Sequence, residues 1–126
     1  MDASALRSQV EAAYRAWDTA FNRGDPKALA ALYTQDATFL PATHAVIEGP
    51  AGIEDFFAGL FANGVTGHRL ELITVHGDTN TVIGAANWSV SGKNADGSDA
   101  TSSGVATHVF EKQPDGSLKL KLHTFN

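Results

Sequence analysis

Residues 24–57 constrain the fold of this chain more than any other segment, because they read as an ordered series of short elements. Gly24, Asp25 and Pro26 mark a boundary between two helices, since an Asp side chain can cap free backbone amides and Pro is tolerated at a first helical position. A short second helix is expected directly afterwards, with apolar positions at Leu29, Leu32 and Tyr33.

A hairpin and a third helix are expected next. Residues 37–40 read as a strand, residues 41–45 as a turn and residues 46–48 as a returning strand. The third helix begins at Gly49-Pro50, and its apolar positions are Ile53, Phe56, Phe57 and Leu60.

The two ends of the chain differ in pattern. Residues 3–22 repeat apolar side chains at three- and four-residue spacing, which places them on one face of a helix. Beyond Asn63-Gly64 the pattern is β, with strands expected over residues 70–76, 81–91, 100–112 and 118–125. The turns between these strands are too short for a crossover helix. We therefore predict an α+β fold in which a curved, mostly antiparallel sheet of about six strands wraps around three N-terminal helices as a cone.

Composition limits the possible functions. The 126 residues, 43% of them hydrophobic, are expected to form one domain over residues 1–126. A net charge of −5 argues against a nucleic-acid partner, because such proteins concentrate Lys and Arg on one face. The sequence has no cysteine, so it has no disulfide, and the cytoplasm is the expected location. Without a run of about 18 apolar residues, no membrane partner is expected.

The order of the elements resembles the nuclear-transport-factor-two-like superfamily, and specifically its SnoaL-like and ketosteroid-isomerase-like branches. The motifs that carry this resemblance are Gly24-Asp25, Leu32-Tyr33 with Asp36-Ala37, and Gly49, Ile53 and Phe56-Phe57. The resemblance covers nearly the whole chain. It implies a cone-shaped fold with an apolar ligand pocket on the concave side of the sheet.

The catalytic groups of a ketosteroid isomerase are not matched by this chain. The resemblance places Trp17 at the position of the oxyanion-binding tyrosine, and Leu40 or Pro41 at the position of the aspartate base. Indole has no useful acidity, and neither Leu nor Pro accepts a proton. Phe57 likewise lacks the hydroxyl of the supporting aromatic residue. We therefore expect no isomerisation of a 3-oxo-Δ5-steroid, and turnover well above background would contradict this expectation.

Histidines are the remaining candidates for proton transfer, because imidazole titrates near neutral pH. The catalytic candidates are His123, His44 and His108, with a solvent-exposed loop position as the alternative for His44. His68 and His76 are expected at the surface. No histidine spacing matches a metal motif, so neither a metal nor a cofactor is expected. The expected ligand-binding residues are Trp17, Phe21, Tyr33, Phe39, Phe57, Trp88, Thr107 and His123, with core packing as the alternative for the aromatic ones.

The last hairpin decides which histidine faces the pocket. Pro114-Asp115-Gly116 suits a three-residue loop, which gives the pairs Glu111 and Lys119, Phe110 and Leu120, His108 and Leu122, and Thr107 and His123. By the family layout His123 then faces the concave side. The convex side would carry an apolar stripe of His108, Phe110, Leu118, Leu120 and Leu122, which predicts a homodimer through that face. In the alternative, the leucines face the helices and the lysines face water.

Two functions from different classes follow. The first is a small apolar-molecule binding protein or enzyme, with the reaction unassigned and isomerase-, cyclase- or lyase-type proton transfer by a histidine as the expected chemistry. The alternative is a non-catalytic association module that builds a homo-oligomer. An open apolar cavity with His123 or His44 at its wall favours the first function, or a carrier of an apolar metabolite, and a cavity filled by side chains favours the second.

Overall fold

The computed structural model describes residues 3–78 and 80–126. Within these residues the chain forms, in order, α1 (Ala3–Asn22), α2 (Pro26–Ala30), β1 (Tyr33–Leu40), β2 (Ile47–Glu48), α3 (Gly49–Ala62), β3 (Thr66–Gly77), β4 (Thr81–Lys93), β5 (Asp99–Lys112) and β6 (Leu118–Phe125). This arrangement confirms the predicted α+β fold of helices followed by a mostly antiparallel sheet. No helix in the described part of the chain is long and apolar enough to span a membrane.

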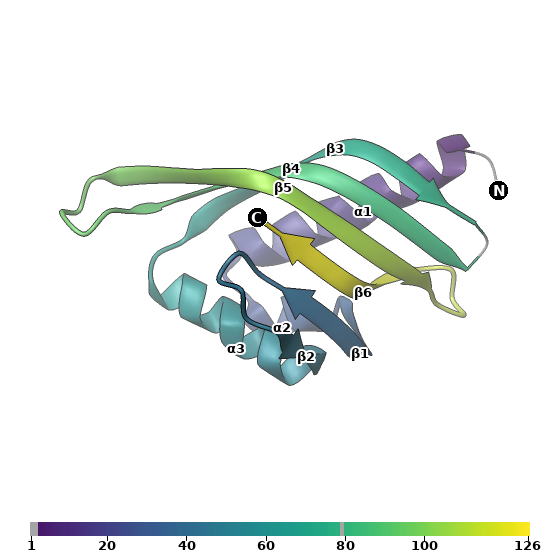
Figure 1. Cartoon of the computed structure of the whole chain (residues 1–126), viewed down its shortest axis with the longest axis horizontal. Coiled ribbons are helices and arrows are strands. Elements are labelled where there is room, and N and C mark those ends of the chain that lie inside the picture. Colours follow the sequence, from purple (N-terminus) through teal and green to yellow (C-terminus); the bar gives the residue numbers. More distant parts are fainter. Residues whose placement is uncertain (1–2, 79) are drawn as a thin grey trace.

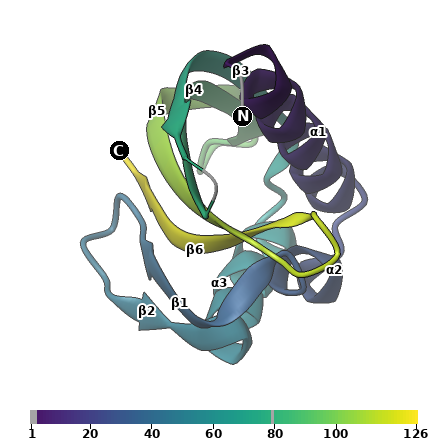
Figure 2. The ribbon, with the colours of Figure 1, turned by 90° about the vertical axis from the view of Figure 1, so that its right-hand side faces the viewer.

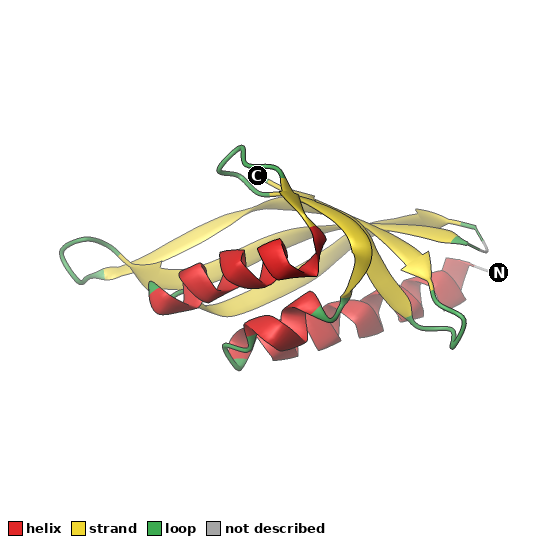
Figure 3. Ribbon diagram, turned by 90° about the horizontal axis from the view of Figure 1, so that it is seen from below, coloured by secondary structure: helices red, strands yellow, loops and turns green. Residues whose placement is uncertain are grey.

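The described strands form one mixed sheet in the order β2-β1-β6-β5-β4-β3. Neighbouring strands are antiparallel except for β1 and β6, which are parallel. Strands β3, β4 and β5 are the longest, and they bend over α1 (Figure 1). The sheet curls so that the helices lie on its concave side (Figure 2). Seen from below, α1 and α3 cross the same face of the sheet (Figure 3).

Helix α2 begins as predicted and ends earlier than predicted. Asp25 accepts a hydrogen bond from the Ala28 backbone N–H at 3.0 Å, and Pro26 occupies the first turn. The helix stops at Ala30, so the prediction that it continues through Tyr33 is wrong. The Leu120 N–H donates to the Leu32 carbonyl at 2.8 Å, and Tyr33 pairs with Leu120. Pairing with β6 therefore places Tyr33 in β1.

The core lies between the concave face of the sheet and the helices. Aromatic rings fill much of it: Phe39 stacks on Phe57 with ring centroids 5.4 Å apart, and Trp17 stacks on Phe21 at the same separation. The apolar residues that recur at helical spacing over residues 3–22 form one face of α1, and this face is buried against the sheet as the spacing predicts. The buried residues of this face are Leu6, Val10, Tyr14, Trp17, Ala20 and Phe21.

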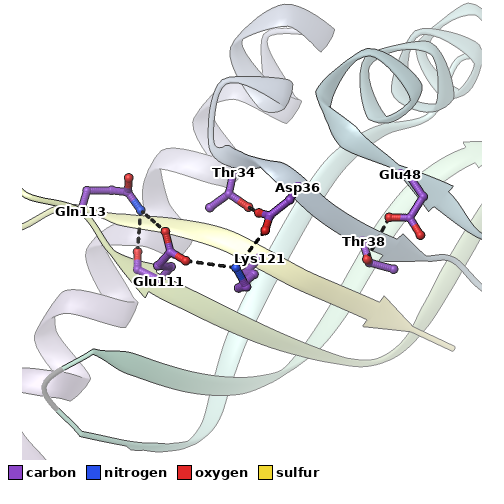
Figure 4. Close-up of polar contacts among 7 residues, drawn as sticks. All are labelled: Thr34, Asp36, Thr38, Glu48, Glu111, Gln113 and Lys121. Carbon is purple, nitrogen blue, oxygen red and sulfur yellow. Dashed lines mark hydrogen bonds and ion pairs between the residues drawn. The ribbon is translucent and has the colours of Figure 1, made fainter.

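The β5–β6 hairpin follows the predicted register only near its turn. Phe110 pairs with Leu120 as predicted, but Val109 then pairs with Leu122 and His108 pairs with His123. Lys121 is thus an extra residue in β6, a β-bulge that shifts the remaining pairs by one. Its ammonium contacts Asp36 and Glu111, each at 3.1 Å, on the outer face of the sheet (Figure 4).

The bulge changes which side chains face inward. The predicted pair of Thr107 with His123 is wrong, because Thr107 pairs with Thr124. The predicted convex apolar stripe is also wrong for His108, Phe110 and Leu120, which are all buried. The alternative holds for Leu118 and Leu120, which lie beside α1, and for Lys121, which faces water, whereas Leu122 pairs with the outward residue Val109.

Candidate functional site

Both histidines of the last hairpin lie inside the protein. His108 and His123 are 2% and 4% exposed, and their ring centroids are 4.5 Å apart. Because the bulge at Lys121 places an extra residue on the outer face, Leu120 and His123 can both point inward although three positions separate them. A regular strand would have turned one of these two side chains toward water.

His123 ends a buried chain of hydrogen bonds. The indole N–H of Trp17 donates to the hydroxyl of Tyr33 at 3.1 Å, and this hydroxyl contacts Nδ1 of His123 at 2.8 Å. Burial raises the pKa of Tyr33 above its ordinary value, so its hydroxyl keeps its proton. The three residues come from α1, β1 and β6, so these hydrogen bonds connect the helix to the parallel pair of strands β1 and β6.

His108 has a tyrosine partner of its own. The hydroxyl of Tyr14 contacts Nδ1 of His108 at 2.9 Å, and the two rings meet edge to face. Burial lowers the pKa of His108 from 6.5 to about 3. Burial, followed by repulsion from the neighbouring imidazoles when they are protonated, also lowers the pKa of His123 well below its ordinary value. Both imidazoles are therefore neutral at pH 7.

His68 is held by a carboxylate. Its Nδ1 lies 2.6 Å from Oδ1 of Asp18, while Oδ2 of Asp18 accepts the Leu70 backbone N–H at 3.0 Å. Asn22, one helical turn after Asp18, binds the backbone of His68 twice: its amide donates to the carbonyl at 3.0 Å and accepts from the N–H at 2.8 Å. Two polar residues of α1 thus fix the start of β3.

The proton positions of this pair follow from its chemistry. A carboxylate can only accept hydrogen bonds, so Nδ1 of His68 carries the proton that Asp18 accepts. In a neutral imidazole the other nitrogen, Nε2, then carries a lone pair. His68 is thereby prepared to accept a proton at Nε2, with Asp18 placed to stabilise the resulting charge.

An apolar cavity of about 250 Å³ connects these groups. His68, His108 and His123 all lie in its wall, and none of the described residues that line it is a carboxylate. Its walls come from α1, α3, β3, β4, β5 and β6, from Val65 and from the loop before β2. The apolar lining residues are Trp17, Phe21, Ala42, Phe56, Phe57, Leu60, Val65, Leu70, Trp88, Val90, Ala106 and Phe125.

A second cavity, of about 330 Å³, lies on the other side of Trp17 and His108, between α1 and the β5–β6 turn. Gln9, Ser117 and Leu118 are among its lining residues, and the buried side-chain oxygen of Gln9 has no hydrogen-bond partner within the described residues. The first cavity is the better candidate site, because it contains three imidazoles among apolar walls. Convergent polar groups in an apolar concavity are the usual form of a small-molecule site.

The structure brings most predicted site residues together. Trp17, Phe21, Phe57, Trp88, His108 and His123 line the 250 Å³ cavity. Tyr33 and Phe39 are fully buried behind it, where Tyr33 supports His123. Thr107 is on the outer face, between the inward residues Ala106 and His108. His44 is exposed in the β1–β2 loop, next to Thr43, which lines the cavity.

Two residues of the site were missed by sequence reasoning. The prediction that His68 is a surface residue is wrong, since it is 9% exposed; His76, as predicted, is exposed. The signal was present, because His68 shares the inward alternation of Leu70 and Leu72 along β3. Asp18 could have been suspected from its spacing of four after Tyr14, which places it beside the buried face of α1.

The described residues contain no group of three or more His, Asp or Glu side chains arranged to hold a metal ion. The imidazoles of the cavity are instead partnered by Tyr33, Tyr14 and Asp18. The arrangement offers a proton-accepting nitrogen and neutral hydrogen-bonding groups within apolar walls.

Known structures resemble this chain along nearly its whole length. A ketosteroid isomerase-like protein from Erwinia carotovora atroseptica has 21% identity and a TM-score of 0.82, covering 94% of this chain and 92% of its own. A nuclear transport factor 2-like superfamily protein from Salmonella enterica has 14% identity and a TM-score of 0.80, covering 99% and 92%. These likenesses establish the fold.

A third structure, an NTF2-like protein with a cystatin-like fold from Novosphingobium aromaticivorans, has 19% identity and a TM-score of 0.78, covering 94% of this chain and 79% of its own. Among curated proteins, none matches the sequence. The sequence pattern of the SnoaL-like domain matches residues 14–119, which include Asp18, His68 and His108. The match spans most of the chain, and the protein therefore belongs to the SnoaL-like domain family, with an NTF2-like, cystatin-like fold.

Proposed function

We propose that this protein binds a small apolar molecule in the 250 Å³ cavity and moves a proton on it, with His68 as the base. The observation that carries the proposal is the 2.6 Å contact between Nδ1 of His68 and Asp18, which leaves Nε2 of His68 for a ligand. Within apolar walls, the charge that forms on the imidazole is stabilised by the fixed carboxylate of Asp18, which lets His68 act as a base on a weakly acidic C–H bond.

The proposed step balances within the site. Nε2 of His68 takes a proton from a carbon next to a carbonyl group, and the electron pair of that C–H bond moves into the carbonyl as an enolate. The imidazolium formed is stabilised by Asp18 at Nδ1. Return of the proton to the same or another carbon regenerates neutral His68, and the net reaction is an exchange or an isomerisation.

His108 and His123 serve less well as the base. Burial lowers the pKa of both imidazoles, and a strongly lowered pKa makes a nitrogen a weak proton acceptor. The tyrosine hydroxyls at their Nδ1 atoms also lack the negative charge that Asp18 supplies to His68. We therefore assign His68 the proton transfer, and His108 and His123 the polar lining of the ligand site.

Exchange of α-protons with D2O tests the proposal without knowledge of the natural substrate. Small ketones such as acetophenone and cyclohexanone are incubated with the protein in D2O, and loss of the α-proton signal is followed by NMR. We expect exchange above the buffer rate, reduced about 10²–10⁴-fold in His68→Gln, the usual contribution of a general base. His76→Gln, at an exposed position, is the matched control. Equal exchange in wild type and His68→Gln would refute the assignment.

A second proposal concerns assembly, and it rests on the outer face of the sheet. Ile73, Ile83 and Val105 come from β3, β4 and β5, and they are 48%, 36% and 43% exposed. Apolar side chains gathered on one face of a sheet favour an interface. We infer a homodimer through this convex face. Its contacts are expected from Ile73, Ile83 and Val105, and not from the apolar stripe of the last hairpin that the sequence predicted.

Light scattering at micromolar concentration tests the dimer. Val105→Lys places a charge on the convex face and should yield monomers. Val46→Lys changes a still more exposed valine in the β1–β2 loop, away from this face, and should leave the dimer intact. A stable wild-type monomer would contradict the proposal.

A further inference from the structure

The hydrogen-bond chain at His123 determines where that imidazole carries its proton. Trp17 can only donate at its indole nitrogen, so the Tyr33 oxygen is an acceptor at 3.1 Å. The Tyr33 hydroxyl has one proton of its own, and within the described residues the other hydrogen bond of that oxygen is the 2.8 Å contact with Nδ1 of His123. Tyr33 therefore donates to Nδ1, and Nδ1 is an acceptor.

An accepting Nδ1 leaves the ring proton on Nε2. His123 is neutral at pH 7, because burial lowers its pKa well below the ordinary value, so the ring has a single proton to place. Nδ1 is occupied by Tyr33, and His123 lies in the wall of the 250 Å³ cavity. Nε2 is thus the ring nitrogen left to contact a ligand.

We propose that His123 presents a fixed N–H donor to the cavity, and that the ligand is an apolar molecule bearing a carbonyl oxygen that accepts this hydrogen bond. The inference deepens the proposed function, on which it rests for the location of the ligand. Tyr33 and Trp17 act as positioning residues, because they hold the tautomer of His123 without contacting the carbonyl themselves.

His68 and His123 then have opposite roles. Nδ1 of His68 donates to Asp18, which leaves a lone pair on Nε2, whereas Nδ1 of His123 accepts from Tyr33, which leaves a proton on Nε2. The ring of Trp17 contacts both, with centroid separations of 4.5 Å from His68 and 6.0 Å from His123. A carbonyl compound matches this pair, since its oxygen accepts a hydrogen bond and its α-carbon loses a proton.

The donor also completes the proposed chemistry. Negative charge gathers on the carbonyl oxygen as the enolate forms, and a donor already aimed at that oxygen stabilises the charge without reorganising. The carbon skeleton is expected to be flat or aromatic, because Trp17, Phe57 and Trp88 supply aromatic rings to the wall of the cavity. Aryl ketones and aldehydes are the simplest members of this class.

NMR of the imidazole nitrogens tests the tautomer directly. In 15N-labelled wild type, a protonated and an unprotonated ring nitrogen differ in shift and in coupling to the ring protons, and we expect the His123 proton on Nε2. Tyr33→Phe removes the donor and should redistribute the proton between the two nitrogens. Tyr14→Phe removes the same atom from the buried pair at His108 and should leave His123 unchanged. A proton on Nδ1 of His123 in wild type would overturn the inference.

Binding of two probes of similar shape tests the ligand class. Acetophenone carries the carbonyl and ethylbenzene does not. The ratio of their two dissociation constants is measured in wild type and in each variant, and comparing these ratios removes the difference in hydrophobicity between the two probes. His123→Phe should shift this ratio about tenfold against acetophenone, the effect of one buried hydrogen bond. Tyr33→Phe should shift it in the same direction, and Tyr14→Phe should not. An unchanged ratio in His123→Phe would overturn the inference.

Neither measurement requires turnover. If α-proton exchange is absent while the tautomer and the probe ratio behave as expected, the base assignment to His68 fails and the donor role of His123 stands. If exchange depends on His68 while the probe ratio is insensitive to His123, the base assignment to His68 stands and the donor role of His123 fails. The carbonyl stretch of bound ¹³C=O acetophenone gives a further check, since it should shift to lower frequency in wild type and not in His123→Phe.

Discussion

His108 and His123 pair directly across the β5–β6 hairpin, with their rings 4.5 Å apart and both nearly inaccessible to water. Two adjacent imidazoles can remain buried only if both stay neutral, because neither has a carboxylate partner to offset a positive charge. The pair therefore links the stability of the fold to the protonation of its interior.

Stability should fall as the pH is lowered through the range where free histidine titrates. The folded-state pKa of His108, about 3, lies below the ordinary value of 6.5, so the unfolded chain binds a proton in this interval and the folded chain does not. The free energy of unfolding then decreases on acidification, by about 1.4 kcal/mol per pH unit for each histidine well inside the interval. His123 acts with the same sign.

Urea denaturation between about pH 5 and pH 7 measures this slope above the range in which carboxylates titrate. His108→Gln should lower the slope by about the contribution of one histidine. His44→Gln changes an exposed histidine and should leave the slope unchanged. A wild-type slope near zero would show that the two imidazoles do not resist protonation.

Asp18→Asn should disable the proposed base while leaving the cavity in place. An amide carries no negative charge, and its NH2 group can donate to Nδ1 of His68, which would move the ring proton to Nε2 and remove the lone pair. We expect α-proton exchange to fall by about 10²–10⁴-fold. Asp36→Asn alters an exposed carboxylate on the outer face and serves as the control. Retention of exchange within about tenfold in Asp18→Asn would exclude a role for the carboxylate.

Asn22→Ala should weaken the attachment of β3 to α1. The Asn22 amide satisfies both the N–H and the carbonyl of His68, and Ala satisfies neither. We expect a loss of about 1–3 kcal/mol in the free energy of unfolding, measured by urea denaturation. Asn87→Ala, at an exposed position of β4, should change stability by no more than about 0.5 kcal/mol. Equal effects of the two substitutions would mean that the contact with His68 contributes nothing.

Gly84→Ala should disturb the Tyr14–His108 pair. An added Cβ would lie 2.5 Å from the Tyr14 hydroxyl and 3.0 Å from Cγ1 of Val10, and the hydroxyl cannot move away without leaving His108. We expect a loss of about 1–3 kcal/mol, as for other overpacked sites. Gly59→Ala has no atom within 4 Å of its new Cβ and is helical, so it should be neutral or stabilising. A stable Gly84→Ala protein would show that α1 can shift at this point.

The fold followed from the sequence because its signals are local. The helical spacing of Leu6, Val10 and Trp17, the Asp25-Pro26 helix start and the alternation along the long strands all describe neighbouring residues. The end of α2 was misplaced because Tyr33 is drawn into β1 by Leu120, a partner far away in sequence. Nonlocal pairing of this kind overrides local propensity.

The candidate site was only half predictable for the same reason. Trp17, Phe57 and Trp88 could be placed from element order, whereas the direction of His123 relative to Leu120 depends on a single extra residue in β6. The hydrogen bond between His68 and Asp18 joins positions 50 residues apart, and no spacing in the sequence predicts this contact. Electrostatic pairs across a fold become visible only when the packing of α1 on β3 is known.

The bulge in β6, more than the composition of the strand, decides whether the hollow of the cone has a polar wall. If Lys121 paired as a regular strand residue, every later side chain would turn to the other face, so that Thr124 would enter the interior and His123 would meet water. Deleting Lys121 would instead leave Leu120 and His123 two positions apart and both facing inward, at the cost of the ion pairs with Asp36 and Glu111. A family member of the same length whose β6 ran without the bulge would therefore share the architecture and lack the chemistry.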